Sequence, residues 1–200
     1  MEIHSPFDQL LNDMPRTLAA DEAFVRELKT YAYPVSVKKG ELLLRPGELC
    51  QNAYFINKGL FINIFTTEQG KECVTGFASD SQYPFLSEIS YFTGTPSNFE
   101  IKAIEDGELL CISRVHIESL SARYPLFASY YQQAMLVIIA KLYMMFAYLQ
   151  SYTAEEFIKF LYAHYKWIIQ RVPDKYIALY MGISTSWYCK LKRKIIRNHT

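Results

Sequence analysis

The stretch RVPDKYIALYMGISTSWYCKLKRKI, residues 171–195, lies near the end of a sequence of 200 residues and predicts two short helices. Pro173 suits the first turn of a helix, where its missing backbone N–H costs nothing. Gly182 tolerates the positive φ of a sharp turn, and Ser184 can cap a second helix beyond it. The stretch also holds six of the 21 Lys and Arg residues of the chain, but only one acidic residue, Asp174.

The apolar residues of the two predicted helices are spaced so that the helices can pack together. They are Ile177, Ala178 and Met181 in the first helix, and Tyr188, Leu191 and Ile195 in the second. A small residue four positions before Gly182 and an apolar residue six positions after it are typical of a helix-turn-helix. The alanine lets the helices cross closely, and the glycine makes the turn.

A basic face lies away from the apolar side of the second helix, with Lys190, Arg193, Lys194 and Arg197 at spacings of 3, 1 and 3. Such a face suits DNA phosphates, while the first helical turn points toward base edges. Trp187 could contact a thymine methyl group or pack against the first helix, and we favour packing. The expected DNA contacts are Lys175, Thr185, Ser186, Trp187, Lys190, Lys192, Arg193, Lys194 and Arg197.

Charge is divided unevenly along the chain. Residues 1–154 hold 12 Lys and Arg against 17 Asp and Glu, whereas residues 155–200 hold 9 against 3. The formal net charge of +1 therefore hides an acidic part and a basic part. The basic part is the better candidate to meet a polyanion.

The four cysteines, at positions 50, 73, 111 and 189, form no CxxC pair and have no ligand-like histidines near them. We therefore predict no metal site, no disulfide framework and no cofactor. Reduced thiols and the lack of a signal-peptide pattern indicate a cytoplasmic protein. The apolar run at 134–149 contains Lys141 and is shorter than the ~20 residues that span a bilayer, so we predict a buried helix and no membrane association.

A single helix is predicted over residues 122–149, with two apolar faces. One face is a coiled-coil seam made of Tyr131, Met135, Ile138, Leu142, Met145 and Leu149. The second is Leu136, Ile139, Tyr143 and Phe146. A helix that is apolar on two sides must be covered on both. We expect the remainder of the chain to cover one face and a second copy to pack on the seam, although burial within a monomer is the alternative.

The first 120 residues have a different texture. Residues 5–30 indicate short helices separated at Pro15, and seven of the eight glycines lie between Gly40 and Gly107, among short β-rich runs. This pattern predicts an antiparallel β-roll of the jelly-roll type. Thr153 and Glu156 form a capping box that begins a further helix at 154. The expected fold class is α+β, with residues 1–120 as N-terminal helices and roll, 121–150 as a dimerisation helix, and 151–200 as a helix-turn-helix domain.

Several segments in this order resemble the Crp/Fnr family of bacterial transcription regulators. They are KKGELLLRPGE at 38–48, AYFINKGLFINIF at 53–65, PFLSEISYFTGTPSNFEIKAIEDGELLCIS at 84–113, and RVPDKYIALYMGIS followed by LKRKI. The last pair is similar to short family members of the Bacteroidetes type. The resemblance implies a cyclic-nucleotide-binding-like roll, a homodimer formed by the central helix, and a DNA-reading second helix at 185–197.

The sequence departs from the cyclic-AMP sensors of that family. If an effector binds the roll, the expected positions are Glu88, Ser97 and Asn98, but the phosphate-binding arginine is missing. No Lys or Arg occurs from Glu72 to Ile101. A buried phosphodiester without a cation would cost several kcal/mol, on the order of other uncompensated buried charges. We therefore predict that cyclic AMP does not control the protein. No cysteine precedes Cys50, which argues against an iron–sulfur sensor.

Together these features predict a sequence-specific DNA-binding regulator that partners DNA, a second copy of itself and an unidentified small-molecule effector. The alternative is a sensor or interaction module whose terminal helices no longer read DNA. An enzyme is not expected, because the sequence has no nucleophile triad, phosphate-binding glycine loop or metal motif.

Overall fold

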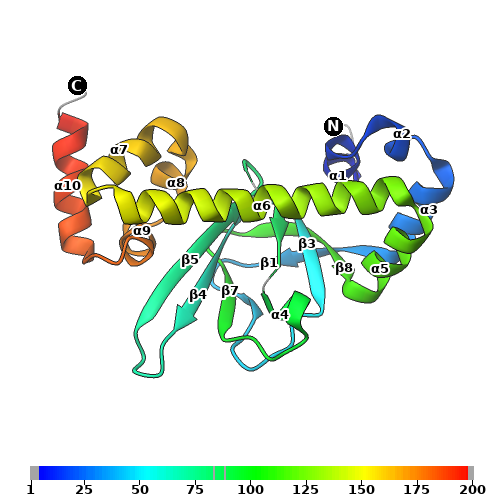
Figure 1. Ribbon diagram of the computed structural model, residues 1–200, viewed down its shortest axis with the longest axis horizontal. Coiled ribbons are helices and arrows are strands. Elements are labelled where there is room, and N and C mark those ends of the chain that lie inside the picture. The colour runs from blue at the N-terminus through cyan, green and yellow to red at the C-terminus, as the bar shows by residue number, and fades with distance from the viewer. Residues whose placement is uncertain (1–4, 83, 88, 198–200) are drawn as a thin grey trace.

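The computed structural model describes residues 5–82, 84–87 and 89–197. Two four-stranded antiparallel sheets form the β-roll (Figure 1). The first has the order β1 (Ala32–Val37), β8 (Gly107–Ser113), β3 (Asn52–Lys58) and β6 (Phe85–Leu86). The second has the order β2 (Leu42–Leu44), β7 (Phe99–Ala103), β4 (Leu60–Thr66) and β5 (Glu72–Ser79).

Three short helices precede the roll: α1 (Asp8–Asp13), α2 (Arg16–Ala19) and α3 (Glu22–Tyr31). The expected break at Pro15 is confirmed, and Asp21 caps α3 by accepting hydrogen bonds from the backbone N–H groups of Ala23 and Phe24. A further helix, α4 (Ile89–Thr93), lies between β6 and β7.

The long helix begins later than the sequence pattern suggested. Instead of one helix from 122, the structure has α5 (Arg114–Arg123) and then α6 (Pro125–Ser151), separated at Tyr124. Pro125 disfavours helical backbone in the residue before it, and Tyr124 has φ −121° and ψ 94°. At the first position of α6 the missing N–H of the proline costs nothing. Figure 1 shows α6 running across the roll, with the N-terminal helices at one end and the C-terminal helices at the other.

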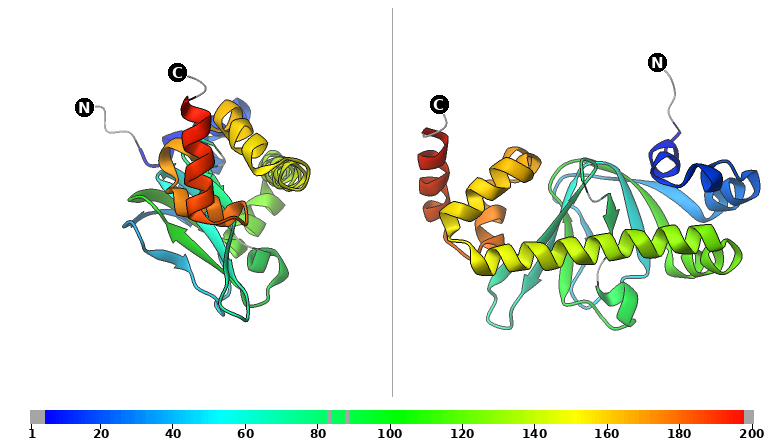
Figure 2. Two further views of the ribbon diagram at one scale, coloured as in Figure 1. Left: turned by 90° about the vertical axis from the view of Figure 1, so that its left-hand side faces the viewer. Right: turned by 45° about the horizontal axis from the view of Figure 1, so that its top comes forward.

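Four helices form the C-terminal unit: α7 (Ala154–His164), α8 (Lys166–Arg171), α9 (Asp174–Tyr180) and α10 (Thr185–Arg197). The predicted capping box is present, because the Thr153 hydroxyl accepts from the Glu156 N–H while the Glu156 carboxylate accepts from the Thr153 N–H. The right-hand view in Figure 2 shows α10, in red, at the end of the molecule farthest from the N-terminal helices, in blue.

Two hydrophobic cores hold these layers together, and β4 contributes to both. Phe61 faces the first core, which lies inside the roll and continues to the N-terminal helices and Phe127 of α6. Leu60, Ile62 and Ile64 face the second core, which they share with Ile168 and Ile177 and other residues of the C-terminal unit. Side chains on a strand alternate between its two faces, so one strand can serve both cores. The C-terminal unit is therefore seated on the outer face of the sheet that contains β4.

Candidate nucleic-acid interface and apolar groove

The α9–α10 pair has the packing that the sequence predicted. Gly182 has φ +65° in the turn, a conformation that side-chain-bearing residues rarely adopt. The Ser184 hydroxyl accepts a hydrogen bond of 3.2 Å from the Trp187 N–H and so caps α10. Ala178 is buried, as the close crossing of the helices requires, and the inward residues of α10 are Tyr188, Leu191 and Ile195.

Four residues form a stripe along the opposite side of α10, which we call the basic stripe. They are Ser186, Lys190, Arg193 and Arg197, at spacings of 4, 3 and 4. This spacing keeps side chains on one face of an α-helix. All four side chains are exposed, and the stripe is about 16 Å long at 1.5 Å per residue. Within the described part of the chain, no acidic side chain forms a salt bridge with Lys190, Arg193 or Arg197.

Two of the expected DNA contacts, Lys192 and Lys194, form salt bridges with other helices of the C-terminal unit. Lys192 Nζ lies 2.7 Å from Asp174 Oδ1 on α9, and the Lys192 side chain is only 22% exposed. Lys194 Nζ lies 2.7 Å from Glu155 Oε2 on α7. Hydrogen bonds from Lys194 and from Lys159 lower the pKa of Glu155. Sequence spacing placed these two lysines with the phosphate-binding group, but it could not show that α7 and α9 supply them with carboxylates.

The remaining candidates lie around the start of the helix pair. Thr185 is exposed at the N-terminal end of α10, beside Ser186. Trp187 is 45% exposed, and Lys190 Nζ lies 5.5 Å from its ring centroid. The Trp187 ring is therefore not enclosed between α9 and α10, in contrast to the packing role that we preferred from the sequence. Lys175 is exposed on α9, with its Nζ 4.5 Å from the Tyr176 ring.

The two apolar faces of α6 differ sharply in coverage. Most of the predicted seam faces its own chain: Met145 is buried, Leu142 is exposed, and Tyr131, Met135, Ile138 and Leu149 are partly buried. The second face is exposed throughout, with Leu136, Ile139, Tyr143 and Phe146 each more than half exposed; we call it the apolar face. The helix as a whole is not the buried helix that we expected. Only 6% of its apolar 18-residue stretch is buried. By length and hydropathy alone, the helix could also cross a membrane.

An apolar groove lies between the roll and α6, with a cavity volume of about 540 Å³. Phe77, Phe85 and Phe99 of the roll line one side, and Met135 and Ile138 of α6 line the other. The groove extends to the C-terminal unit, where Tyr165, Trp167 and Tyr180 complete its wall. Among its described lining residues, Lys141 is the one cation, and burial lowers its pKa.

The effector positions expected from the sequence do not meet in this groove. Ser97 is buried away from it, and its hydroxyl is used in a turn, where it accepts from the Phe99 N–H and donates to the Phe99 carbonyl. Asn98 is exposed and does not line the groove. Glu88 lies outside the described residues. The sequence pattern pointed only to the segment that carries these three residues. It gave no sign of the groove-lining aromatic residues of α8 and α9, because only folding brings them to the groove.

Among the residues that the structure describes, no group of three His, Cys, Asp or Glu side chains is arranged to hold a metal ion. Cys50 and Cys111 are buried, while Cys73 and Cys189 are partly exposed. Cys111 Sγ lies 3.2 Å from the Tyr33 hydroxyl, and burial raises the pKa of its thiol. The two buried thiols therefore belong to the packed interior.

Comparison with known proteins adds a family match and several structural matches. Residues 34–124 match the cyclic nucleotide-binding domain family. No curated protein sequence matches the chain. The chain is similar in structure to FixK2 from Bradyrhizobium japonicum, with a TM-score of 0.70, 15% identity, and coverage of 84% of this chain and 86% of FixK2.

Two other solved structures cover most of the chain. A transcriptional regulator assigned to the Crp/Fnr family from Eubacterium rectale gives a TM-score of 0.70 at 14% identity, covering 94% of this chain and 88% of that one. The c-di-GMP-responsive global regulator CLP of Xanthomonas campestris gives 0.66 at 14% identity, covering 90% and 93%. The predicted fold class, an antiparallel sheet core followed by a long helix and further helices, is confirmed.

Proposed function

Residues 34–124 match the cyclic nucleotide-binding domain family, and the chain as a whole has the fold of the Crp/Fnr regulators to which it is similar. From this premise we propose that the protein is a dimeric regulator that reads DNA with α10. The basic stripe carries the proposal. It pairs with no acid among the described residues, it lies opposite the buried side of α10, and it follows a glycine turn. In a helix-turn-helix this helix enters the major groove, which is about 12 Å wide and admits an α-helix.

The residues of α10 divide into two classes by their position along the helix. Ser186 and Lys190, near its N-terminal end, are placed to contact base edges. Arg193 and Arg197, one and two turns further on, are placed over phosphates, where they fix register without reading sequence. Lys192 and Lys194 hold α10 against α9 and α7 instead.

A second copy of the chain is the proposed occupant of the apolar face of α6. Four large apolar side chains on one helix face, each more than half exposed, form a surface that a soluble protein covers by association. A two-fold dimer would also present two copies of α10, as a palindromic site requires. We place the protein in the cytoplasm, in contact with the chromosome, and assign it a binding role and not a catalytic one.

The lining of the groove supports control by an apolar effector and not by a cyclic nucleotide. Its walls are mainly aromatic and aliphatic, as in many small-molecule sites, and the cation-free interval from Glu72 to Ile101 contributes no partner for a phosphate. Calorimetry with cyclic AMP or cyclic GMP at millimolar concentration should give no saturable heat. Micromolar binding would contradict this assignment and would point to Lys141 as the phosphate partner.

Selection from a pool of double-stranded oligonucleotides with a randomised centre tests the DNA-binding proposal. The expected product is a palindrome whose half-sites are centred about one helical turn, ~34 Å, apart. Genome-wide mapping of the sites bound by the native protein in cells should then show the same palindrome. A pool that shows no enrichment over several rounds would contradict the proposal and favour a protein-interaction role for the terminal helices.

A further inference from the structure

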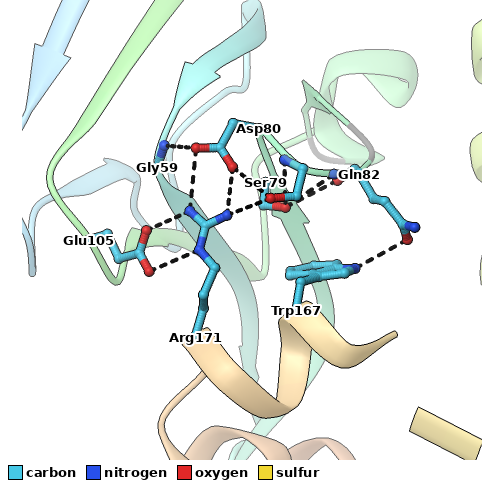
Figure 3. A network of polar contacts seen from close by, with 8 residues as sticks. Gly59, Ser79, Asp80, Gln82, Glu105, Trp167 and Arg171 are labelled. Carbon is cyan, nitrogen blue, oxygen red and sulfur yellow. Dashed lines mark hydrogen bonds and ion pairs between the residues drawn. The ribbon is translucent and has the colours of Figure 1, made fainter. Parts of the chain in front are cut away.

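Arg171, the last residue of α8, joins the C-terminal unit to the roll through two carboxylates (Figure 3). Its Nη1 lies 2.6 Å from Asp80 Oδ1, and its Nη2 lies 2.6 Å from Glu105 Oε2. Nη2 also donates to Asp80 Oδ2 at 3.3 Å, and Nε donates to Glu105 Oε1 at 3.2 Å. One guanidinium therefore makes two-point contacts with both acids, and we call this set the Arg171 clamp.

A backbone hydrogen bond within the roll orients the Asp80 carboxylate of the clamp. Asp80 Oδ2 also accepts a hydrogen bond of 2.8 Å from the Gly59 N–H, in the turn between β3 and β4. Burial would raise the pKa of Asp80, but hydrogen bonds from Arg171 and from Gly59 outweigh it and lower that pKa. The same segment of the roll accepts from the C-terminal unit again at Gln82, whose Oε1 lies 3.1 Å from Trp167 Nε1.

The apolar contact beside the clamp holds the C-terminal unit against the roll, whereas the clamp sets the angle between them. Phe77 and Tyr180 meet edge to face with ring centroids 5.0 Å apart, which joins β5 to α9 within the second core. Apolar burial is non-directional and tolerates small rotations between the two surfaces. A planar guanidinium held by two carboxylates through four hydrogen bonds does not tolerate such rotations, because its donors point in fixed directions.

We propose that Arg171 is a positioning residue for DNA reading: it fixes the angle of the C-terminal unit on the roll, and hence the separation of the two α10 helices in the dimer. This inference rests on the proposed function. A dimer with fixed α10 helices should bind one half-site spacing tightly and reject others. A dimer with loosely held units should bind each half-site as before, but should discriminate poorly between spacings.

Removing the arginine alone should lower the thermal stability more than removing all three charges. In Arg171→Gln, two neighbouring carboxylates lose their shared cation, and their repulsion acts directly across the boundary between roll and C-terminal unit. In the triple variant Asp80→Asn, Glu105→Gln, Arg171→Gln, that repulsion is absent, but the directional contacts are lost as well. We expect the triple variant to recover thermal stability without recovering spacing selectivity. Arg171→Lys keeps the positive charge but loses the planar, forked guanidinium, so it should recover only part of the spacing selectivity.

The DNA experiment uses the full-length chain and the palindrome found by selection, its single half-site, and palindromes with one base pair added or removed between half-sites. Arg171→Gln should weaken palindrome binding by about tenfold or more, a loss of ~1.4 kcal/mol per factor of ten, and leave half-site binding unchanged. The preference of Arg171→Gln for the original half-site spacing over the altered spacings should fall by a similar factor. Lys38→Gln is the matched control, because Lys38 and Asp106 form an exposed pair of 2.9 Å within the roll. Wild-type spacing preference in Arg171→Gln would overturn the proposal.

A second readout needs no DNA. The chain has two tryptophans, so Trp187→Phe leaves Trp167 beside the clamp as the sole fluorescent indole. Adding Arg171→Gln to that background should shift Trp167 emission to longer wavelength as the boundary opens, whereas adding Lys38→Gln should not. If the wild type binds no DNA but this shift occurs, the proposed function fails while the clamp stands as the contact that orients the unit. If emission is unchanged, the clamp does not hold the unit in place.

Discussion

α6 and α10 each present a surface that their own chain leaves uncovered, and the two surfaces differ in chemistry. The apolar face of α6 exposes Ile139 to 62% and Tyr143 to 70%. The basic stripe of α10 exposes Lys190, Arg193 and Arg197, while Tyr188 on the opposite side of that helix is fully buried. One surface is costly to leave in water, and the other is well solvated as it stands.

That difference underlies the partner that we propose for each surface. Apolar side chains gain free energy from any matching apolar surface, at about 25 cal/mol per Å² removed from water, and a second copy supplies such a surface by symmetry. Cationic side chains gain little from burial, but they release condensed counterions when they neutralise phosphates. We therefore propose that α6 mediates self-association and that α10 binds DNA, a division of roles that substitutions on the two helices can test.

The largest effect is expected from a charge placed on the apolar face. Ile139→Glu should convert the dimer to a monomer, since an unpaired carboxylate buried at an interface costs several kcal/mol, on the order of a lost buried ion pair. Sedimentation velocity measures the outcome. Gln133→Glu, on an exposed polar position of the same helix, is the control and should remain dimeric. An Ile139→Glu dimer of unchanged affinity would move the interface elsewhere.

The neighbouring substitution Ile138→Glu sharpens the comparison between the two sides of α6. Both isoleucines border the groove, but Ile138 is partly buried whereas Ile139 is 62% exposed, so replacement of Ile138 should lower the melting temperature. Ile139→Glu should change the melting temperature much less once both variants are compared as monomers.

The next effect concerns base reading on α10. Ser186→Ala or Lys190→Ala should each cost ~1–3 kcal/mol on the selected palindrome and relax specificity at the contacted base pair. Competition binding against palindromes with single base changes measures this. A uniform loss on all sequences would mean that these residues contact phosphates instead.

A smaller and differently shaped effect is expected at Arg193. Arg193→Ala should weaken binding to all sequences alike and reduce the slope of log affinity against log salt by about one unit per lost phosphate contact. Lys192→Ala is the matched comparison, because Lys192 is paired with Asp174 and not presented outward. It should lower stability and leave the salt slope nearly unchanged. An equal reduction of the salt slope in Arg193→Ala and Lys192→Ala would contradict the division of roles within α10.

The smallest effect is expected on the buried side of α10. Tyr188 is fully buried, and its hydroxyl has no hydrogen-bond partner in the described structure. Removing an unsatisfied buried hydroxyl relieves a desolvation cost, so Tyr188→Phe should leave the free energy of unfolding unchanged or raise it by up to ~1 kcal/mol. Urea denaturation measures the change. A clear loss of stability would show that the hydroxyl has a partner in solution.

Local signals explain what could be predicted from sequence. Gly182 and Ser184 fix the turn and the cap of α10, and Thr153 with Glu156 fixes the start of α7, because each acts within a few residues of itself. Pro125 is a local signal of the same kind and sets the start of α6, whereas apolar periodicity alone predicts a start three residues earlier.

Long-range choices account for what could not be predicted. Both faces of α6 are apolar, so the sequence could not show that Met145 faces the second core while Phe146 faces solvent. Arg171 meets partners 91 and 66 residues away, at Asp80 and Glu105, which no local pattern can indicate. The same holds for Lys192 and Lys194, whose carboxylate partners lie on other helices.

The salt dependence of affinity for the selected palindrome tests the central claim most directly. If Arg193 and Arg197 of two subunits each neutralise a phosphate, the slope of log affinity against log salt should be about −4. The Arg193→Ala, Arg197→Ala double variant should then reduce it by about four units across the dimer. A wild-type slope near zero, or a double variant with the wild-type slope, would contradict the assignment of α10 as the DNA-reading helix.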